Sequence, residues 1–176
     1  MKKKILSLLL TVLLVSAVMT STASAGGNVG LRNVQFSLGS LDAIGTLTGL
    51  GGYPAGVRAD LTASGIATVV CTNQGGNQSP GQNPNVSATG EQIIGPQGIT
   101  KKGTAPLDVK AELGPITAIE GGCANDNWTA EIVSVLWTNA TISVYDNATN
   151  ELLLERHYTC NPALQTATSV SCTETN

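Results

Sequence analysis

Apolar and polar residues alternate with a period of two along much of this chain, and no long stretch repeats with the period of a helix. In one run Val34, Phe36 and Leu38 alternate with polar neighbours, and in another every second residue from Val57 to Ala63 is apolar. Such alternation is typical of a strand with one face buried and the other in water. Glycine and proline separate the runs, as turns between short strands require. The pattern predicts an all-β fold.

The alternating runs indicate how many strands to expect. Further strands are predicted at Gly65–Cys71, Leu107–Ala111, Trp128–Trp137, Ala140–Tyr145 and Leu152–Tyr158. The clearest hairpin joins the last two of these through Asp146–Asn150, whose side chains favour turns. Another turn is expected at Trp137–Asn139. About eight to ten strands in one chain indicate an antiparallel β-sandwich, immunoglobulin-like or jelly-roll-like, with a small β-barrel as the alternative.

The N-terminus has the three parts of a secretory signal peptide. Lys2, Lys3 and Lys4 form a basic start, an apolar run extends from Ile5 to Val18, and small residues end in Ala23-Ser24-Ala25. The apolar run is shorter than the roughly 20 residues of a membrane-spanning helix. We therefore expect cleavage after Ala25, which divides the chain into a signal peptide, 1–25, and a single secreted β-sandwich domain, 26–176.

Cleavage makes the protein more acidic. The whole chain has nine Lys and Arg residues against twelve Asp and Glu, and the signal peptide contains three of the nine, so the formal charge changes from −3 to −6. A mature chain without a basic patch is not expected to bind nucleic acid or anionic membranes. The residue directly after the cleavage site is glycine rather than cysteine and no apolar segment ends the chain, so no membrane anchor is expected. The predicted location is extracellular, or periplasmic if the source has an outer membrane.

The four cysteines, Cys71, Cys123, Cys160 and Cys172, all lie after the signal peptide. An even number of cysteines in an exported chain is typical of disulfides. A zinc site is the alternative, but the sequence has no Cys-x-x-Cys pair and His157 is its one histidine. Two disulfides and no metal site are therefore predicted.

Four cysteines allow three pairings. We favour Cys71–Cys123, which joins two segments of similar Gly/Asn-rich sequence, and Cys160–Cys172, which closes a short loop near the C-terminus. A competing observation is Tyr158-Thr-Cys160, which has the form of the immunoglobulin tyrosine corner and would pair Cys160 with Cys71. The sequence leaves both possibilities open.

Two stretches lack the alternating pattern and indicate surface loops, Thr72–Pro84 and Gly114–Asn127. A Cys71–Cys123 bond would hold them together at one end of the domain. The loops would then form a rigid, amide-rich binding surface. The candidate binding residues are Asn73, Gln74, Asn77, Gln78, Asn125, Asp126 and Asn127. The alternative is that the loops only connect strands.

The titratable residues form no recognisable catalytic motif. His157 lies in a predicted strand, and no Gly-x-Ser-x-Gly sequence supplies a nucleophile. Carboxylates that could act in pairs in a glycosidase are scattered along the chain: Glu91, Asp108, Glu131, Glu151 and Glu155. The oxygen-rich runs Asn125–Asn127 and Asp146–Glu151 do not have the spacing of a helix-loop calcium site, and turn chemistry explains both. No enzymatic activity and no cofactor are expected.

Several segments resemble small secreted all-β bacterial proteins of unassigned function: Asn33–Ser40, Gly45–Gly51, Cys71–Asn77 and Asn127–Ala130. The resemblance implies export and a β fold but no activity. Our leading hypothesis is a non-enzymatic extracellular domain that binds a ligand or surface partner through its loops. The second is a subunit that self-associates into a matrix or filament by strand pairing, with Val29–Leu38 lent to a neighbour. The third is a secreted hydrolase.

Overall fold

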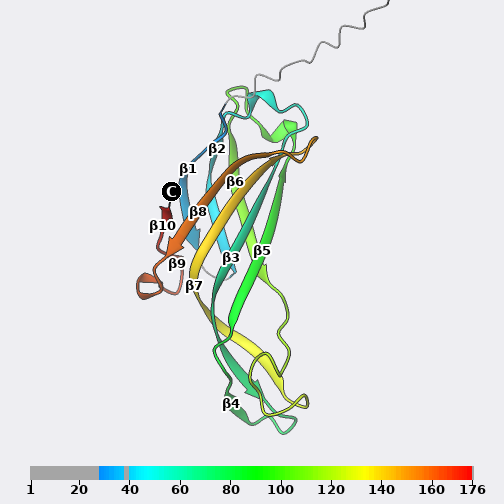
Figure 1. Cartoon of the computed structure of the whole chain (residues 1–176), viewed down its shortest axis with the longest axis vertical. Helices are drawn as coiled ribbons and strands as arrows, with labels where there is room; N and C mark the ends of the chain where they lie inside the picture. The colour runs from blue at the N-terminus through cyan, green and yellow to red at the C-terminus, as the bar shows by residue number, and fades with distance from the viewer. Residues whose placement is uncertain (1–27, 38–39, 176) are drawn as a thin grey trace, which may run out of the picture.

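The structure is a computed structural model that describes residues 28–37 and 40–175 (Figure 1). The predicted signal peptide, 1–25, lies outside the described residues. Within them the strands are β1 (Gly30–Ser37), β2 (Leu41–Thr48), β3 (Val57–Thr72), β4 (Gln78–Pro80), β5 (Asn85–Ile94), β6 (Ala105–Leu113), β7 (Thr129–Asp146), β8 (Leu152–Cys160), β9 (Ser169–Val170) and β10 (Cys172–Thr175).

Helical structure is confined to three short 3₁₀ turns in the described part of the chain: η1 (Leu50–Gly52), η2 (Pro96–Gly98) and η3 (Pro162–Leu164). No helix among these residues is long and apolar enough to cross a membrane.

All the strand pairs are antiparallel, and the strands follow the order β10-β8-β7-β3-β5-β6-β2-β1-β9, with β4 on β3. The sheet folds over itself at β6, where Ala105–Ala111 pair with β2 and only Glu112 and Leu113 pair with β5. Its two ends meet because Ser171 alone separates β9, which pairs with β1, from β10, which pairs with β8. The result is a nearly closed barrel (Figure 1). The predicted all-β fold is confirmed, and the curvature is consistent with a sandwich or a small barrel.

The predicted alternation of buried and exposed residues is clearest in β3. Every second residue from Val57 to Cys71 is buried, and the intervening residues face outward. Between the two layers the core consists mostly of alanine, valine and leucine, which lets the layers approach closely. Phe36 of β1 and Tyr158 of β8 join the layers where the sheet closes, with ring centroids 5.1 Å apart in an edge-on contact. The core therefore fills the barrel.

β3 and β7 are much longer than the other strands and continue past the barrel. β7 pairs with β3 along nearly its whole length, whereas β8 pairs with β7 only from Asn139 to Tyr145. The remaining halves of β3 and β7, with β4 and the loops beside them, form an arm, defined here as residues 66–84 and 114–136 (Figure 1). The arm carries both loops predicted to form the binding surface.

Two local predictions are wrong. The turn expected at Trp137–Asn139 is absent, because β7 runs straight through with a bulge at Thr138, whose hydroxyl donates to the Ser64 carbonyl (3.1 Å). The loop expected over Thr72–Pro84 contains β4, which pairs with Val70–Thr72. In the segment expected to pair with a neighbouring molecule, β1 pairs with β2, and β9 covers only Phe36 and Ser37 on its other edge, so self-association through it stays a prediction.

The hydroxyl of Tyr158 is buried and has no hydrogen-bond partner among the described residues. Burial, and secondarily the charge of Glu174, raises the pKa of Tyr158 to about 12. Because the unfolded side chain ionises near pH 10, the folded state holds this proton more tightly, and stability falls as the pH rises from 10 towards 12.

We expect Tyr158→Phe to raise the free energy of unfolding by about 1 kcal/mol at pH 8, because the unpaired hydroxyl is removed. The gain should grow between pH 10 and 12, since phenylalanine does not titrate. Urea unfolding at pH 8, 10 and 11 measures both effects. The prediction is contradicted if Tyr158→Phe is less stable than the unmodified protein at pH 8 and loses the same free energy of unfolding as that protein between pH 8 and 11.

Candidate functional site

The end of the arm is fastened by a disulfide between Cys71, the penultimate residue of β3, and Cys123 in the loop 114–128. The second disulfide joins Cys160 to Cys172. Both favoured pairings are confirmed, and the Cys71–Cys160 pairing suggested by the tyrosine-corner pattern is wrong. The first bond holds the loop 114–128 against the end of β3, and the backbone N–H of Gln82 adds a hydrogen bond to the Gly121 carbonyl (2.8 Å).

The loop 114–128 has a defined shape although it contains no strand. The Thr117 backbone N–H and hydroxyl both donate to the carboxylate of Glu120, at 2.9 and 2.7 Å. These two hydrogen bonds lower the pKa of Glu120, and the bond from the backbone N–H has the larger effect. The backbone N–H groups of Gly121 and Cys123 donate to the carbonyls of Thr117 and Ala118. Internal hydrogen bonds therefore fix the part of the loop that leads into the disulfide.

The seven predicted binding residues all lie at this end of the arm, close in sequence to the two cysteines of the first disulfide. Four of them follow Cys71, in the turn between β3 and β4 and at the start of β4, and three follow Cys123. Two of them shape the backbone. The Asn73 side-chain oxygen accepts from the Asn77 N–H (2.9 Å), and the Asn125 side-chain oxygen accepts from the Asn127 N–H (3.0 Å). The other five side chains are exposed, and the structure assigns them no hydrogen bond: Gln74, Asn77, Gln78, Asp126 and Asn127. We call these five the tip residues.

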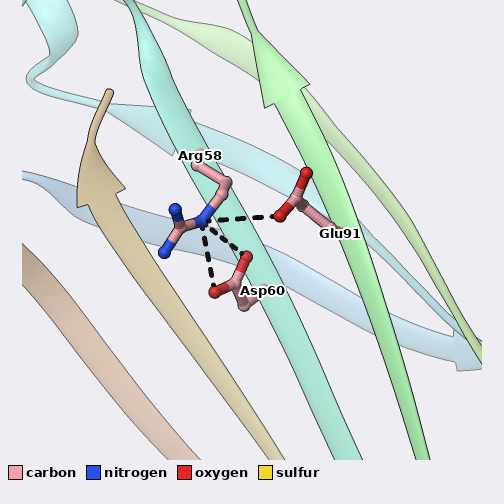
Figure 2. Close-up of polar contacts among 3 residues, drawn as sticks. All are labelled: Arg58, Asp60 and Glu91. Carbon is pink, nitrogen blue, oxygen red and sulfur yellow. Dashed lines mark hydrogen bonds and ion pairs between the residues drawn. The ribbon is translucent and has the colours of Figure 1, made fainter. Parts of the chain in front are cut away.

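A second polar cluster lies on the outer face of the barrel (Figure 2). Asp60 of β3 and Glu91 of β5 are direct cross-strand partners, and Arg58 lies between them. Its Nε atom is 3.0 Å from Asp60 Oδ1 and 3.7 Å from Glu91 Oε2, and its guanidinium stacks on the Tyr145 ring at 4.7 Å. Like charges directly opposite each other destabilise a sheet, and Arg58 offsets this repulsion. The cluster is a pair of carboxylates that share one arginine and keep a formal net charge of −1.

His157 takes part in a chain of polar contacts across β7 and β8. Its Nδ1 atom lies 3.1 Å from the Thr141 hydroxyl, and its Nε2 atom lies 3.1 Å from the carboxylate of Glu155. The order hydroxyl, imidazole, carboxylate is that of a hydrolytic triad. However, β8 pairs on both sides, with β7 and β10, so its backbone N–H groups near His157 are used in the ladder. Those N–H groups are therefore not available to stabilise an oxyanion.

The structure does not bring the predicted carboxylates together. Glu91 is in the Arg58 cluster and Glu155 contacts His157, while Asp108, Glu131 and Glu151 lie exposed on separate elements. No three His, Cys, Asp or Glu side chains gather into a metal-binding group in the described ranges. The two oxygen-rich runs serve turns instead: Asp146 Oδ1, for example, accepts from the Ala148 N–H at 2.7 Å.

The sequence analysis missed Arg58, Asp60 and Thr141. Arg58 and Asp60 are two residues apart on a predicted strand and so share a face, which is a signal in the sequence. Their closeness to Glu91, and that of Thr141 to His157, depends on strand register.

Comparison of the chain with protein-family models, with curated proteins and with solved structures finds no match. The resemblance to small secreted bacterial proteins therefore stays a prediction.

Proposed function

We propose that this chain is an exported, non-enzymatic binding domain that contacts an uncharged, hydroxyl-rich surface such as a polysaccharide through its tip residues. The observation that carries the proposal is the position of the Cys71–Cys123 disulfide, which fastens two polar loops at the end of the arm. Both disulfides also favour export, because such bonds persist in oxidising compartments.

A rigid tip favours binding because less conformational entropy is lost when the partner docks. The arm lies beyond the closed part of the barrel, so its loops depend on the disulfide and on local hydrogen bonds for their shape. The disulfide thus supports the interpretation of the tip as a preorganised surface.

The chemistry of the tip indicates the class of partner. Four of the five tip residues are amides, each of which can donate and accept hydrogen bonds. Sugar hydroxyls have the same dual capacity. No Lys or Arg occurs in the two loops, so a phosphate or sulfate group would meet no cation there. These properties favour a neutral polymer over an anionic one.

The proposal predicts that replacing Gln74, Asn77 and Asn127 together with alanine weakens binding to a polysaccharide at least tenfold. The probes are insoluble cellulose, chitin and cross-linked dextran, and the measurement is the fraction of protein that pellets with each. The matched control replaces three exposed amides elsewhere, Gln35, Asn85 and Gln97. If the unmodified protein pellets with none of the three, or if both variants bind equally, the proposal is wrong.

A further inference from the structure

The arm has a strand edge that no other described strand covers. β8 leaves β7 at Asn139, so the stretch of β7 from Thr129 to Ser134 has β3 on one side and no strand on the other (Figure 1). In an antiparallel strand, alternate residues direct both backbone polar groups towards the same edge. On either side of a bulge at Val133, this edge therefore presents unpaired N–H and C=O groups to which a further strand can bind.

Gln165 marks where the open edge begins. Its side-chain amide donates to the Val135 carbonyl and accepts from the Trp137 N–H (3.1 Å). One primary amide thus occupies two backbone groups of β7 on the side away from β3. The contact shows that these two groups point towards that side and are open to a hydrogen-bond partner. Beyond Val135 the chain supplies no such substitute within its described residues.

An apolar trough runs beside the edge. One hollow of about 400 Å³ and another of about 340 Å³ share Leu113 and Ile132 in their walls. The first also contains Val133, Leu136 and Ala167, and the second contains Val86 and Ile116. Val133 is 54% exposed and Leu136 is 44% exposed. The side chains of a strand added to β7 would have apolar surface to cover.

The acidic charges around the trough favour a basic partner. Glu120 lines one hollow, Glu131 lies on the open edge, and neither hollow has a Lys or Arg in its walls. A second copy of the chain would bring another Glu131 to the edge, which is repulsive. A basic strand suits the site better than a second copy does.

We propose that the β7 edge from Thr129 to Ser134 accepts an extended segment of another polypeptide, in which apolar and basic residues alternate. Its backbone pairs with β7, its apolar side chains cover the trough, and its basic side chains, on the opposite face, meet Glu131. This site is separate from the tip residues, and the inference does not depend on the proposed polysaccharide binding.

Three capped, fluorescent octapeptides test the proposal: alternating Lys and Val, alternating Glu and Val, and the Lys/Val sequence with alternate backbone nitrogens methylated. Fluorescence anisotropy gives the affinities. We expect the Lys/Val peptide to bind most tightly, with the amides of residues 129–134 protected from hydrogen exchange. The methylated peptide should lose at least tenfold in affinity, because it keeps the side chains but cannot complete the ladder.

Two protein variants sharpen the test. Glu131→Lys should weaken the Lys/Val peptide and strengthen the Glu/Val peptide, each by about twofold to fivefold, as cross-strand charge pairs imply. Glu151→Lys makes the same charge change in the distant β7–β8 turn and should leave both affinities unchanged. Gln165→Ala should tighten the Lys/Val peptide by exposing two more backbone groups.

Three results would overturn the proposal. One is equal binding of the methylated and unmethylated peptides, and another is an absence of protection at residues 129–134. The third is a concentration-dependent dimer, measured by light scattering, that Glu131→Lys abolishes or strengthens, because it would assign the edge to a second copy. Loss of tip binding in the Gln74/Asn77/Asn127 variant changes none of these readouts, so the two proposals fail independently.

Discussion

Replacing Gly90 with alanine is expected to lower the free energy of unfolding by about 3 kcal/mol, at the upper end of the usual cost of overpacking. A Cβ atom at Gly90 would lie 1.8 Å from the carbonyl oxygen of Lys110 and 2.5 Å from its carbonyl carbon. Both are backbone atoms, so no side-chain rotation relieves the clash. β5 and β6 would have to separate at the place where the sheet folds from one layer to the other.

The matched control is Gly114→Ala, because a Cβ atom there has no neighbour within 4 Å. Urea unfolding followed by circular dichroism should show Gly114→Ala close to the unmodified protein and Gly90→Ala far less stable. Equal midpoints for the two variants would show that β6 can move aside at little cost, and the close crossing would then not be a determinant of the fold.

The strands that sequence alone predicts well are those with one consistently apolar face. β3 is the best example, because every second residue from Val57 to Cys71 is buried, although the two strands expected there form one continuous strand. β2 and β5 were harder to identify, since each also carries an isoleucine on its outer face. Ile44 is 50% exposed and Ile93 is 62% exposed, and small residues such as Ala43 and Ala88 fill the inner face. Apolar residues on both faces hide the period of two.

Part of the candidate site was also predictable from the sequence. The matching sequences around Cys71 and Cys123 indicated their pairing, and that pairing places the amide-rich loops together. The arm itself was not predictable, because the Trp137–Asn139 segment has the composition of a turn but forms a bulge within β7. The Arg58 cluster and the open edge of β7 were also out of reach, because both depend on which strands are neighbours and where each pairing ends.

Removing the Cys71–Cys123 bond by replacing both cysteines with alanine is expected to lower the free energy of unfolding by about 4 kcal/mol. This figure follows from loop-closure entropy for a separation of 52 residues. The same relation gives about 3 kcal/mol for Cys160–Cys172, which are 12 residues apart. Urea unfolding of the two double variants compares them directly, and the first should have the lower midpoint.

The two variants should also differ in where they loosen. Cys160 and Cys172 are paired residues of β8 and β10, so ladder hydrogen bonds still hold those strands when the bond is absent. Cys123 lies in a loop, and the hydrogen bonds around it are mainly local. Hydrogen exchange in residues 114–128 should therefore accelerate in the Cys71/Cys123 variant. The core amides of β3 should exchange faster only by the factor that the lower free energy of unfolding predicts. If exchange in 114–128 stays slow, local hydrogen bonds alone keep the tip rigid, and the disulfide cannot be the reason that the loops are preorganised for binding.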